Sequence, residues 1–185
     1  MKKITDVVEA NAIIPKVSNS IEFDYISKTN AKLVLLEKTT ITDYVDKIKE
    51  LRASKRRTIL NIDNIEGFTN NVYSMKFILR NCPADIILSA NPDVILYAKK
   101  QGYLTTFRAV LTNDQSFENA YINANKSMAD SIELIPGIAF KAITKLKKKT
   151  NKMVLASDLI WDVEDAQQVY EAGAYAIVTS NTNNW

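Results

Sequence analysis

Short apolar runs rich in β-branched residues alternate with amphipathic stretches along almost the whole chain. Eight of these runs are candidates for buried strands: residues 12–14, 33–36, 59–63, 85–88, 104–111, 131–135, 153–156 and 176–178. The stretches between them place apolar residues at helical spacing, as at Ile41, Tyr44, Val45, Ile48 and Leu51. Continuous apolar strands are typical of a parallel sheet covered on both faces. The pattern therefore predicts an α/β fold of repeated strand–helix units.

Residues that favour turns and helix ends separate the predicted elements. Pro15 closes the first apolar run, and a helix capped by Ser18 or Asn19 is expected to extend to about Lys28. Further candidate helix starts are Thr39 or Thr40, Asn91 before Pro92, Asn113 or Asp114, and Asp162. Helix stops are predicted at Gly102 and Gly173.

The number and spacing of the strands narrow the fold class further. Eight strands that recur every 20 to 25 residues or so favour a closed, TIM-like parallel β/α barrel over an open sheet. Barrels of this type usually need about 250 residues, whereas this chain has 185. We therefore predict a single small barrel domain over residues 1–185, with minimal loops and a final helix that is truncated or absent. A homodimer would cover surface that so small a barrel leaves exposed.

Composition places the chain among ordinary soluble proteins. Hydrophobic residues make up 46% and charged residues 24%, which is too apolar for a disordered chain. The apolar runs are too short to span a bilayer, and the N-terminus lacks the apolar segment of a signal peptide. Cys82 is the only cysteine, so an internal disulfide is excluded. We expect a cytoplasmic protein without membrane association.

The absence of histidine removes several classes of chemistry. No Ser-His-Asp or Cys-His arrangement, no His general acid or base and no His-ligated metal site can form. One cysteine cannot build a thiolate zinc site, so neither a metal nor a cofactor is expected. The formal net charge of +3 permits contact with nucleic acid without predicting it.

Polar residues gather at the carboxyl ends of the predicted strands, where β/α barrels carry their functional groups. They are Glu37, Asn61, Asp63, Ser89, Asn91, Arg108, Glu133, Pro136, Gly137, Ser157, Asp158, Thr179, Ser180 and Asn181. The carboxylates of Glu37, Asp63 and Glu133 and the cation of Arg108 come from different strands. Their convergence predicts a binding site. The alternative is that polar strand ends only satisfy the backbone of the loops.

Arg108 is the most informative of these residues. A guanidinium within an apolar strand is costly unless it is paired or lines a cavity. Two interpretations stay open: Arg108 clamps a ligand or its carboxylate, or it forms a structural ion pair with Glu133 or Asp63.

Two basic clusters also have two interpretations. One is formed by Lys55, Arg56 and Arg57, the other by Lys145, Lys147, Lys148, Lys149 and Lys152. Both lie at or after the C-terminal ends of predicted helices, where cations complement the helix dipole. The functional alternative is a surface that contacts RNA phosphates.

Five features in order resemble the glycerol-3-phosphate-responsive transcription antiterminators, which regulate glycerol-uptake operons. The last is the string Thr179-Ser180-Asn181, closed by Trp185, and the helix at 164–174 precedes it. The others are the run Glu133-Leu134-Ile135-Pro136-Gly137-Ile138, Asp63 with Gly67, and Arg108 within its strand. The resemblance covers nearly the whole chain.

The resemblance implies a small barrel that binds glycerol 3-phosphate and acts on leader mRNA, so that transcription reads through a terminator. It implies no catalysis. Carried over by position, the residues that line the ligand pocket are Asp63, Arg108, Glu133, Gly137, Ser180 and Asn181, with Ser157 beside them.

The chain departs from the family pattern where a phosphate would bind. Ser157 and Asp158 stand where the family has two glycines, whose backbone amides suit an anion. Ala90 and Asn91 replace a threonine and a cation, Asn61 replaces a histidine, and Thr182 replaces a lysine or arginine. Each change lowers the expected affinity for an anion.

Two other functions are compatible with these residues. A barrel enzyme would use Asp63 or Glu133 as the general base and Arg108 as an electrophilic clamp, acting on a small metabolite. A family member that had lost its ligand would serve as a protein-interaction module, with Asp158 filling the pocket.

Overall fold

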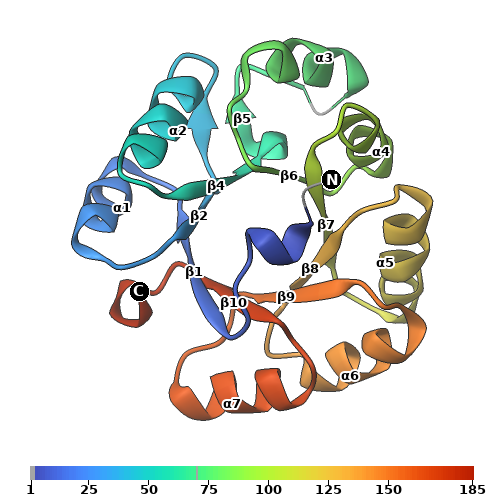
Figure 1. The fold of residues 1–185 in the computed structure, drawn as a ribbon. Helices are drawn as coiled ribbons and strands as arrows, with labels where there is room; N and C mark the ends of the chain where they lie inside the picture. Colours follow the sequence, from blue (N-terminus) through green and yellow to red (C-terminus); the bar gives the residue numbers. More distant parts are fainter. Residues whose placement is uncertain (1–2, 70) are drawn as a thin grey trace.

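The computed structural model describes residues 3–69 and 71–185, and eight parallel strands close a barrel in it (Figure 1). Around the barrel the order is β1, β10, β9, β8, β7, β6, β4 and β2. The bounds of these strands are β1 Ala12–Val17, β2 Leu33–Leu36, β4 Arg57–Asn61, β6 Ile86–Ser89, β7 Leu104–Val110, β8 Ser131–Ile135, β9 Met153–Ser157 and β10 Ala176–Thr179. The predicted parallel β/α barrel is confirmed.

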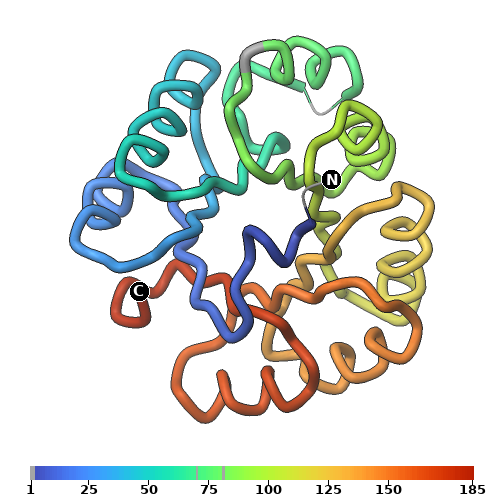
Figure 2. Tube along the Cα trace, in the orientation of Figure 1, coloured from blue at the N-terminus to red at the C-terminus, as the bar shows by residue number. Residues whose placement is uncertain are grey.

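Within the described residues, seven α-helices surround the barrel, and the tube in Figure 2 follows the chain from each strand out to its helix. Their bounds are α1 Ser20–Tyr25, α2 Tyr44–Ala53, α3 Val72–Asn81, α4 Pro92–Lys100, α5 Asp114–Lys126, α6 Phe140–Lys149 and α7 Val163–Glu171. None of these helices has the length and apolar content needed to cross a membrane.

Alternate residues along each strand face two different apolar layers. The inner layer fills the barrel and includes Ile14, Leu35, Ile59, Leu155 and Val178. The residues between them pack outward against the helices in two further clusters. Because both faces are covered, the strands appear in the sequence as continuous apolar runs.

The N-terminal segment closes one end of the barrel. The 3-10 helix η1 (Ile4–Asp6) lies across the barrel axis in Figure 1, and Val7 and Val8 follow it. Both valines are buried among Leu33, Leu104 and Met153, which stand at the beginnings of their strands. The amino-terminal end of the barrel is therefore plugged by apolar side chains.

The C-terminal residues pack on the outside of the barrel. A 3-10 helix, η4 (Thr182–Asn184), follows β10, and the indole Nε1 of Trp185 donates a hydrogen bond of 2.9 Å to the carbonyl of Thr179. The Trp185 ring lies 6.1 Å from the ring of Tyr25. The sequence predicts a final helix that is truncated or absent. The structure has the short 3-10 helix η4 at this position, and Trp185 after it packs against α1 through an aromatic contact.

Three predicted boundaries were wrong. Pro15 does not end the first strand, which continues to Val17 because the partner strands β10 and β2 pair with it on both sides. Thr39 and Thr40 do not open a helix; they form strand β3, which pairs with β5 (Ile65–Glu66), and α2 begins at Tyr44. The third barrel strand ends at Asn61, and residues 62–64 form the 3-10 helix η3.

Candidate functional site

Strand register brings Arg108 next to the fully buried Glu133. Arg108 on β7 pairs in register with Glu133 on β8, and its Nε donates a hydrogen bond of 2.5 Å to Glu133 Oε2. The two terminal nitrogens of Arg108 donate to Glu37, just after β2, at 2.8 and 2.7 Å. Arg108 therefore bridges two carboxylates across the carboxyl-terminal end of the barrel. This end, with Lys16, Asn61, Ser157 and Asp158, is called the barrel mouth below.

Burial and charge act against each other in this bridge. Burial raises the pKa of Glu37, but the hydrogen bonds and charge of Arg108 outweigh it and hold the pKa below 4.5. Glu133 is fully buried, and burial raises its pKa although the Arg108 charge opposes the change. Burial also opposes the charge of Arg108, yet the two glutamates raise its pKa overall. The guanidinium therefore stays charged and fixes the positions of both carboxylates.

Three buried polar atoms at the mouth make no hydrogen bond of standard geometry among the described residues. They are Glu133 Oε1, Asn61 Nδ2 and Ser157 Oγ. All three side chains are completely buried. Two of these side chains still lie close enough to a carboxylate to act on it: against the larger effect of burial, Ser157 acts to lower the pKa of Glu133, and Asn61 acts to lower that of Glu37. A buried polar group without a partner costs about 1–3 kcal/mol, so the mouth carries polar groups that a ligand with hydroxyl groups could satisfy.

Lys16 is a mouth residue that the sequence analysis missed. It lies on β1, two residues after the inner-facing Ile14, and its ammonium forms an ion pair with Asp158. The lysine side chain is 11% exposed and the aspartate side chain 32%. The first predicted strand ends at Pro15, so Lys16 was not among the predicted strand-end residues. The position of Lys16 at the end of an apolar run, directly after Pro15, is the sequence feature that could have identified it.

The backbone at Asp158 has a conformation that favours glycine. Asp158 and Leu159 have φ angles of 69° and 61°. This left-handed region costs most side chains about 1 kcal/mol or more, and aspartate and asparagine tolerate it better. Asp158 therefore tolerates this loop conformation while it adds a carboxylate to the mouth.

Asp63 links the segment after β4 to the end of β6 by hydrogen bonds. Its carboxylate accepts hydrogen bonds of 2.6 Å from Ser89 Oγ and from the backbone N–H of Ala90. Ser89 Oγ in turn accepts from the N–H of Asn91, which caps α4. Burial raises the pKa of Asp63, and the bonds from Ala90 and Ser89 oppose this only in part. Arg108 thus pairs with Glu133, as one interpretation expected, and with Glu37 rather than with Asp63.

The remaining candidates differ in how they contribute. A Cβ at Gly137 would lie 2.7 Å from the backbone nitrogen of Ser157, so only glycine lets these two loops pack. Asn181 accepts a hydrogen bond from the Asn183 N–H and caps η4. Ser180 is exposed at the end of β10. Gly137 and Asn181 therefore shape the rim of the mouth.

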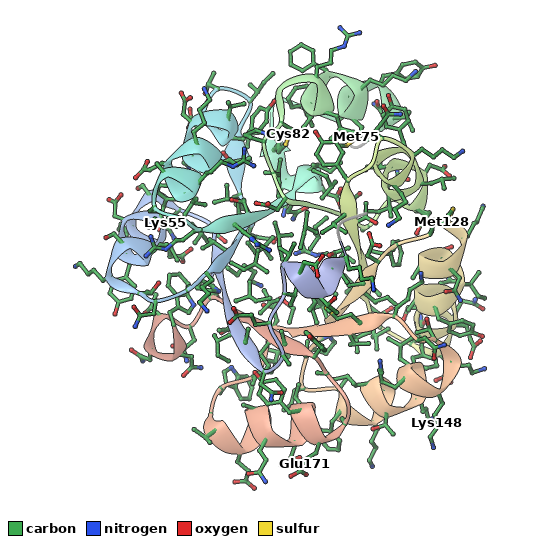
Figure 3. All side chains as sticks on the ribbon, in the orientation of Figure 1. Lys55, Met75, Cys82, Met128, Lys148 and Glu171 are labelled. Carbon is green, nitrogen blue, oxygen red and sulfur yellow. The ribbon has the colours of Figure 1, made fainter. Side chains whose placement is uncertain are left out.

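The two basic clusters lie away from the mouth, because they follow helices that run back to the amino-terminal end of the barrel. Arg56 donates to the carbonyls of Ile26 and Thr29, and Arg57 donates to that of Asp6. In the second cluster, Lys147 donates to the carbonyl of Lys152. Figure 3 shows Lys55 and Lys148 on different sides of the barrel. The two clusters therefore form separate surfaces.

The mouth combines acceptors, donors and one ammonium group without a metal-ligand cluster. In the part of the chain that the structure describes, no three metal-ligating side chains gather. Both oxygens of Asp63 are occupied, and Glu133 is held by Arg108. Hydrogen bonding to hydroxyl groups is the chemistry that these residues supply, and the Lys16 ammonium is paired with Asp158.

Comparison with known proteins shows which family this chain resembles in sequence and structure. A solved glycerol uptake operon antiterminator regulatory protein from Listeria monocytogenes is 26% identical, with a TM-score of 0.90 and 94% of each chain covered. A related solved protein from Thermotoga maritima is 22% identical, with a TM-score of 0.82, and covers 95% of this chain and 98% of its own. The uncharacterised protein YgcP of Escherichia coli K12 is 23% identical over 97% of this chain and 94% of its own. The model of the glycerol-3-phosphate responsive antiterminator family matches residues 13–185, and the chain belongs to that family.

Proposed function

We propose that this protein is an antiterminator-type regulator that senses a small phosphorylated polyol at the barrel mouth and acts on leader mRNA of a glycerol-uptake operon. The observation that carries the proposal is the set of buried, unpartnered polar atoms beside the Arg108 bridge. Family membership over residues 13–185 supports a regulatory role rather than a catalytic one.

The polar atoms of the mouth match the hydroxyl groups of a polyol. Glu133 Oε1 accepts hydrogen bonds when ionised, Asn61 Nδ2 donates them, and Ser157 Oγ does both. Because Arg108 holds Glu133 and Glu37 in place, these groups are oriented before the ligand arrives. Binding would then give these three groups hydrogen bonds of standard geometry, which favours the loaded state.

The phosphate of the effector would bind at Lys16. Its ammonium is the cation of the mouth that does not belong to the Arg108 bridge, and the carboxylate of Asp158 already occupies it. A phosphate therefore competes with Asp158 for the same cation. This competition lowers affinity for the effector without removing the site.

The test is binding of the leader RNA from the operon that encodes the protein, measured by fluorescence anisotropy. Glycerol 3-phosphate at millimolar concentration should tighten binding, whereas glycerol and inorganic phosphate should leave it unchanged. Allosteric coupling of this type is typically 5- to 150-fold. Absence of RNA binding without any ligand and with each of the three compounds would refute the proposal.

A further inference from the structure

Helices α5 and α6 lie side by side on the outside of the barrel (Figure 1). A cleft lies at each end of this helix pair, and the surface between the two clefts is called the α5–α6 groove below. The first cleft, of about 540 Å³, lies between the N-terminal ends of the helices and is lined by Phe117, Phe140, Lys141 and Lys145. The second, of about 750 Å³, lies at their C-terminal ends and is lined by Asn125, Lys148, Lys149 and Lys152. The thirteen residues of α5 set the length of the groove at about 20 Å.

The groove is strongly basic. Its two clefts are lined by five lysines and by the two acidic residues Asp114 and Asp130. The charge of Asp130 is already paired with Lys99. Helix α6 carries further basic charge in Lys147 and contains no acidic residue. The formal charge of the whole chain is only +3, so basic charge is concentrated on this surface.

Two aromatic rings of α5 lie on this surface: Phe117 lines the first cleft, and Tyr121, whose hydroxyl donates a hydrogen bond to Glu118, follows one turn later. Phe117 and Tyr121 stand one turn apart on α5, with ring centroids 6.4 Å apart in an edge-to-face arrangement. The ammonium of Lys149 lies 5.1 Å from the centroid of the Tyr121 ring. Both rings are partly exposed. Lysines for phosphates and aromatic rings for bases are the groups by which proteins bind single-stranded nucleic acid.

The other basic cluster lacks this combination. Its two arginines are bound to backbone carbonyls, which ties neighbouring loops together. In contrast, Lys145 and Lys148 are exposed, and within the described residues neither forms an ion pair or a side-chain hydrogen bond. Lys145 and Lys148 of α6 are therefore available to an external anion.

We propose that the α5–α6 groove binds single-stranded RNA, with the lysines of α6 on the phosphates and Phe117 and Tyr121 against the bases. This inference rests on the proposed function, because it names the surface through which the regulator contacts mRNA. The groove lies on the outer wall of the barrel, separate from the effector site at the mouth. Effector and RNA can therefore be bound at the same time.

The first experiment compares two double variants that each remove two positive charges. K145Q/K148Q changes the groove, and K55Q/K100Q changes exposed lysines outside it. Binding of a labelled oligouridylate is measured by anisotropy at several salt concentrations. Each phosphate contact on a single strand contributes about 0.7 to the slope of log affinity against log salt. K145Q/K148Q should lower that slope by about 1.4, and K55Q/K100Q should leave it unchanged.

The second experiment tests the aromatic contribution. F117L keeps an apolar side chain in the packed position but removes the ring. Stacking on a base makes binding about fivefold to a hundredfold tighter, so F117L should weaken oligouridylate binding within that range. Heparin, a polyanion without bases, should bind F117L and the native chain equally well. Circular dichroism checks that each variant is folded.

The outcomes separate this inference from the proposed function. An equal loss of oligouridylate binding in the two double lysine variants, or no loss in either, would overturn the proposal that the groove binds RNA. RNA binding by the native chain would still support the regulatory role. If the native chain bound neither oligouridylate nor leader RNA, both proposals would be refuted.

Discussion

The two ends of the barrel are built from different chemistry. At the amino-terminal end, Val7 and Val8 are buried among the inner apolar side chains and close the barrel. At the carboxyl-terminal end, the same interior is filled by Arg108, Glu133 and Glu37, with buried polar atoms left unpartnered. The inner positions of the strands thus change from apolar to charged along the barrel axis.

This difference separates stability from recognition. Burial of an apolar side chain contributes about 1.5–3 kcal/mol without needing a partner. A buried charge contributes little net stability, and breaking its pair is strongly destabilising. The plug therefore stabilises the fold. The mouth contributes less to stability, because its buried polar groups are kept oriented for a ligand. Four changes test the comparison, from the largest expected effect to the smallest.

Removal of the guanidinium should have the largest effect. Arg108→Ala leaves Glu133 buried without its counter-charge and should lower the free energy of unfolding by about 3–5 kcal/mol, measured in urea. The control is Lys32→Ala, which breaks an exposed ion pair with Glu9 and should cost less than about 1 kcal/mol. Similar losses in both variants would mean that the Arg108 bridge is no more important than a surface pair.

Shortening a side chain of the plug should lower the stability of the protein and leave ligand binding unchanged. Val8→Ala removes two buried methyl groups and should lower the free energy of unfolding by about 2 kcal/mol. The affinity for glycerol 3-phosphate should stay unchanged, because Val8 lies at the opposite end of the barrel. Calorimetric titration of the variant measures this, and a large loss of affinity would show that the two ends are coupled.

Removing the carboxylate that competes for Lys16 should strengthen ligand binding at the mouth. Asp158→Gly should raise the affinity for glycerol 3-phosphate about tenfold, the equivalent of one weak charged hydrogen bond of about 1.5 kcal/mol. Asp158→Asn removes the charge but retains a side chain that tolerates the left-handed backbone, so it should give a similar gain. A gain in the glycine variant only would assign the effect to the backbone.

The smallest effect concerns the pH dependence of stability. Because burial raises the pKa of Asp63 above 3.8, the folded chain retains this proton at pH values where the unfolded chain has released it. Its stabilising contribution is therefore fully present below the unfolded pKa and is lost as the pH rises through the folded pKa. The native chain should lose stability relative to Asp63→Asn over that range. A difference that did not vary with pH would contradict the raised pKa.

The sequence predicted the barrel and the strand ends that form the mouth, because both depend on local patterns. Buried parallel strands produce continuous apolar runs, which can be recognised within each segment. The pairing of Arg108 with Glu37 joins residues 71 positions apart, which no local pattern specifies. Lys16 was missed because a proline beside it usually ends a strand. Thr39 and Thr40 were assigned to a helix cap because their partner β5 lies in a distant segment.

The central claim is that the mouth binds a phosphorylated polyol, and thermal unfolding tests it most directly. The melting temperature is measured with millimolar glycerol 3-phosphate, with glycerol and with inorganic phosphate. A ligand at a hundred times its Kd stabilises a protein by about 2.7 kcal/mol. We predict a clear rise with glycerol 3-phosphate and none with the other two. Equal melting temperatures under all three conditions would contradict the claim.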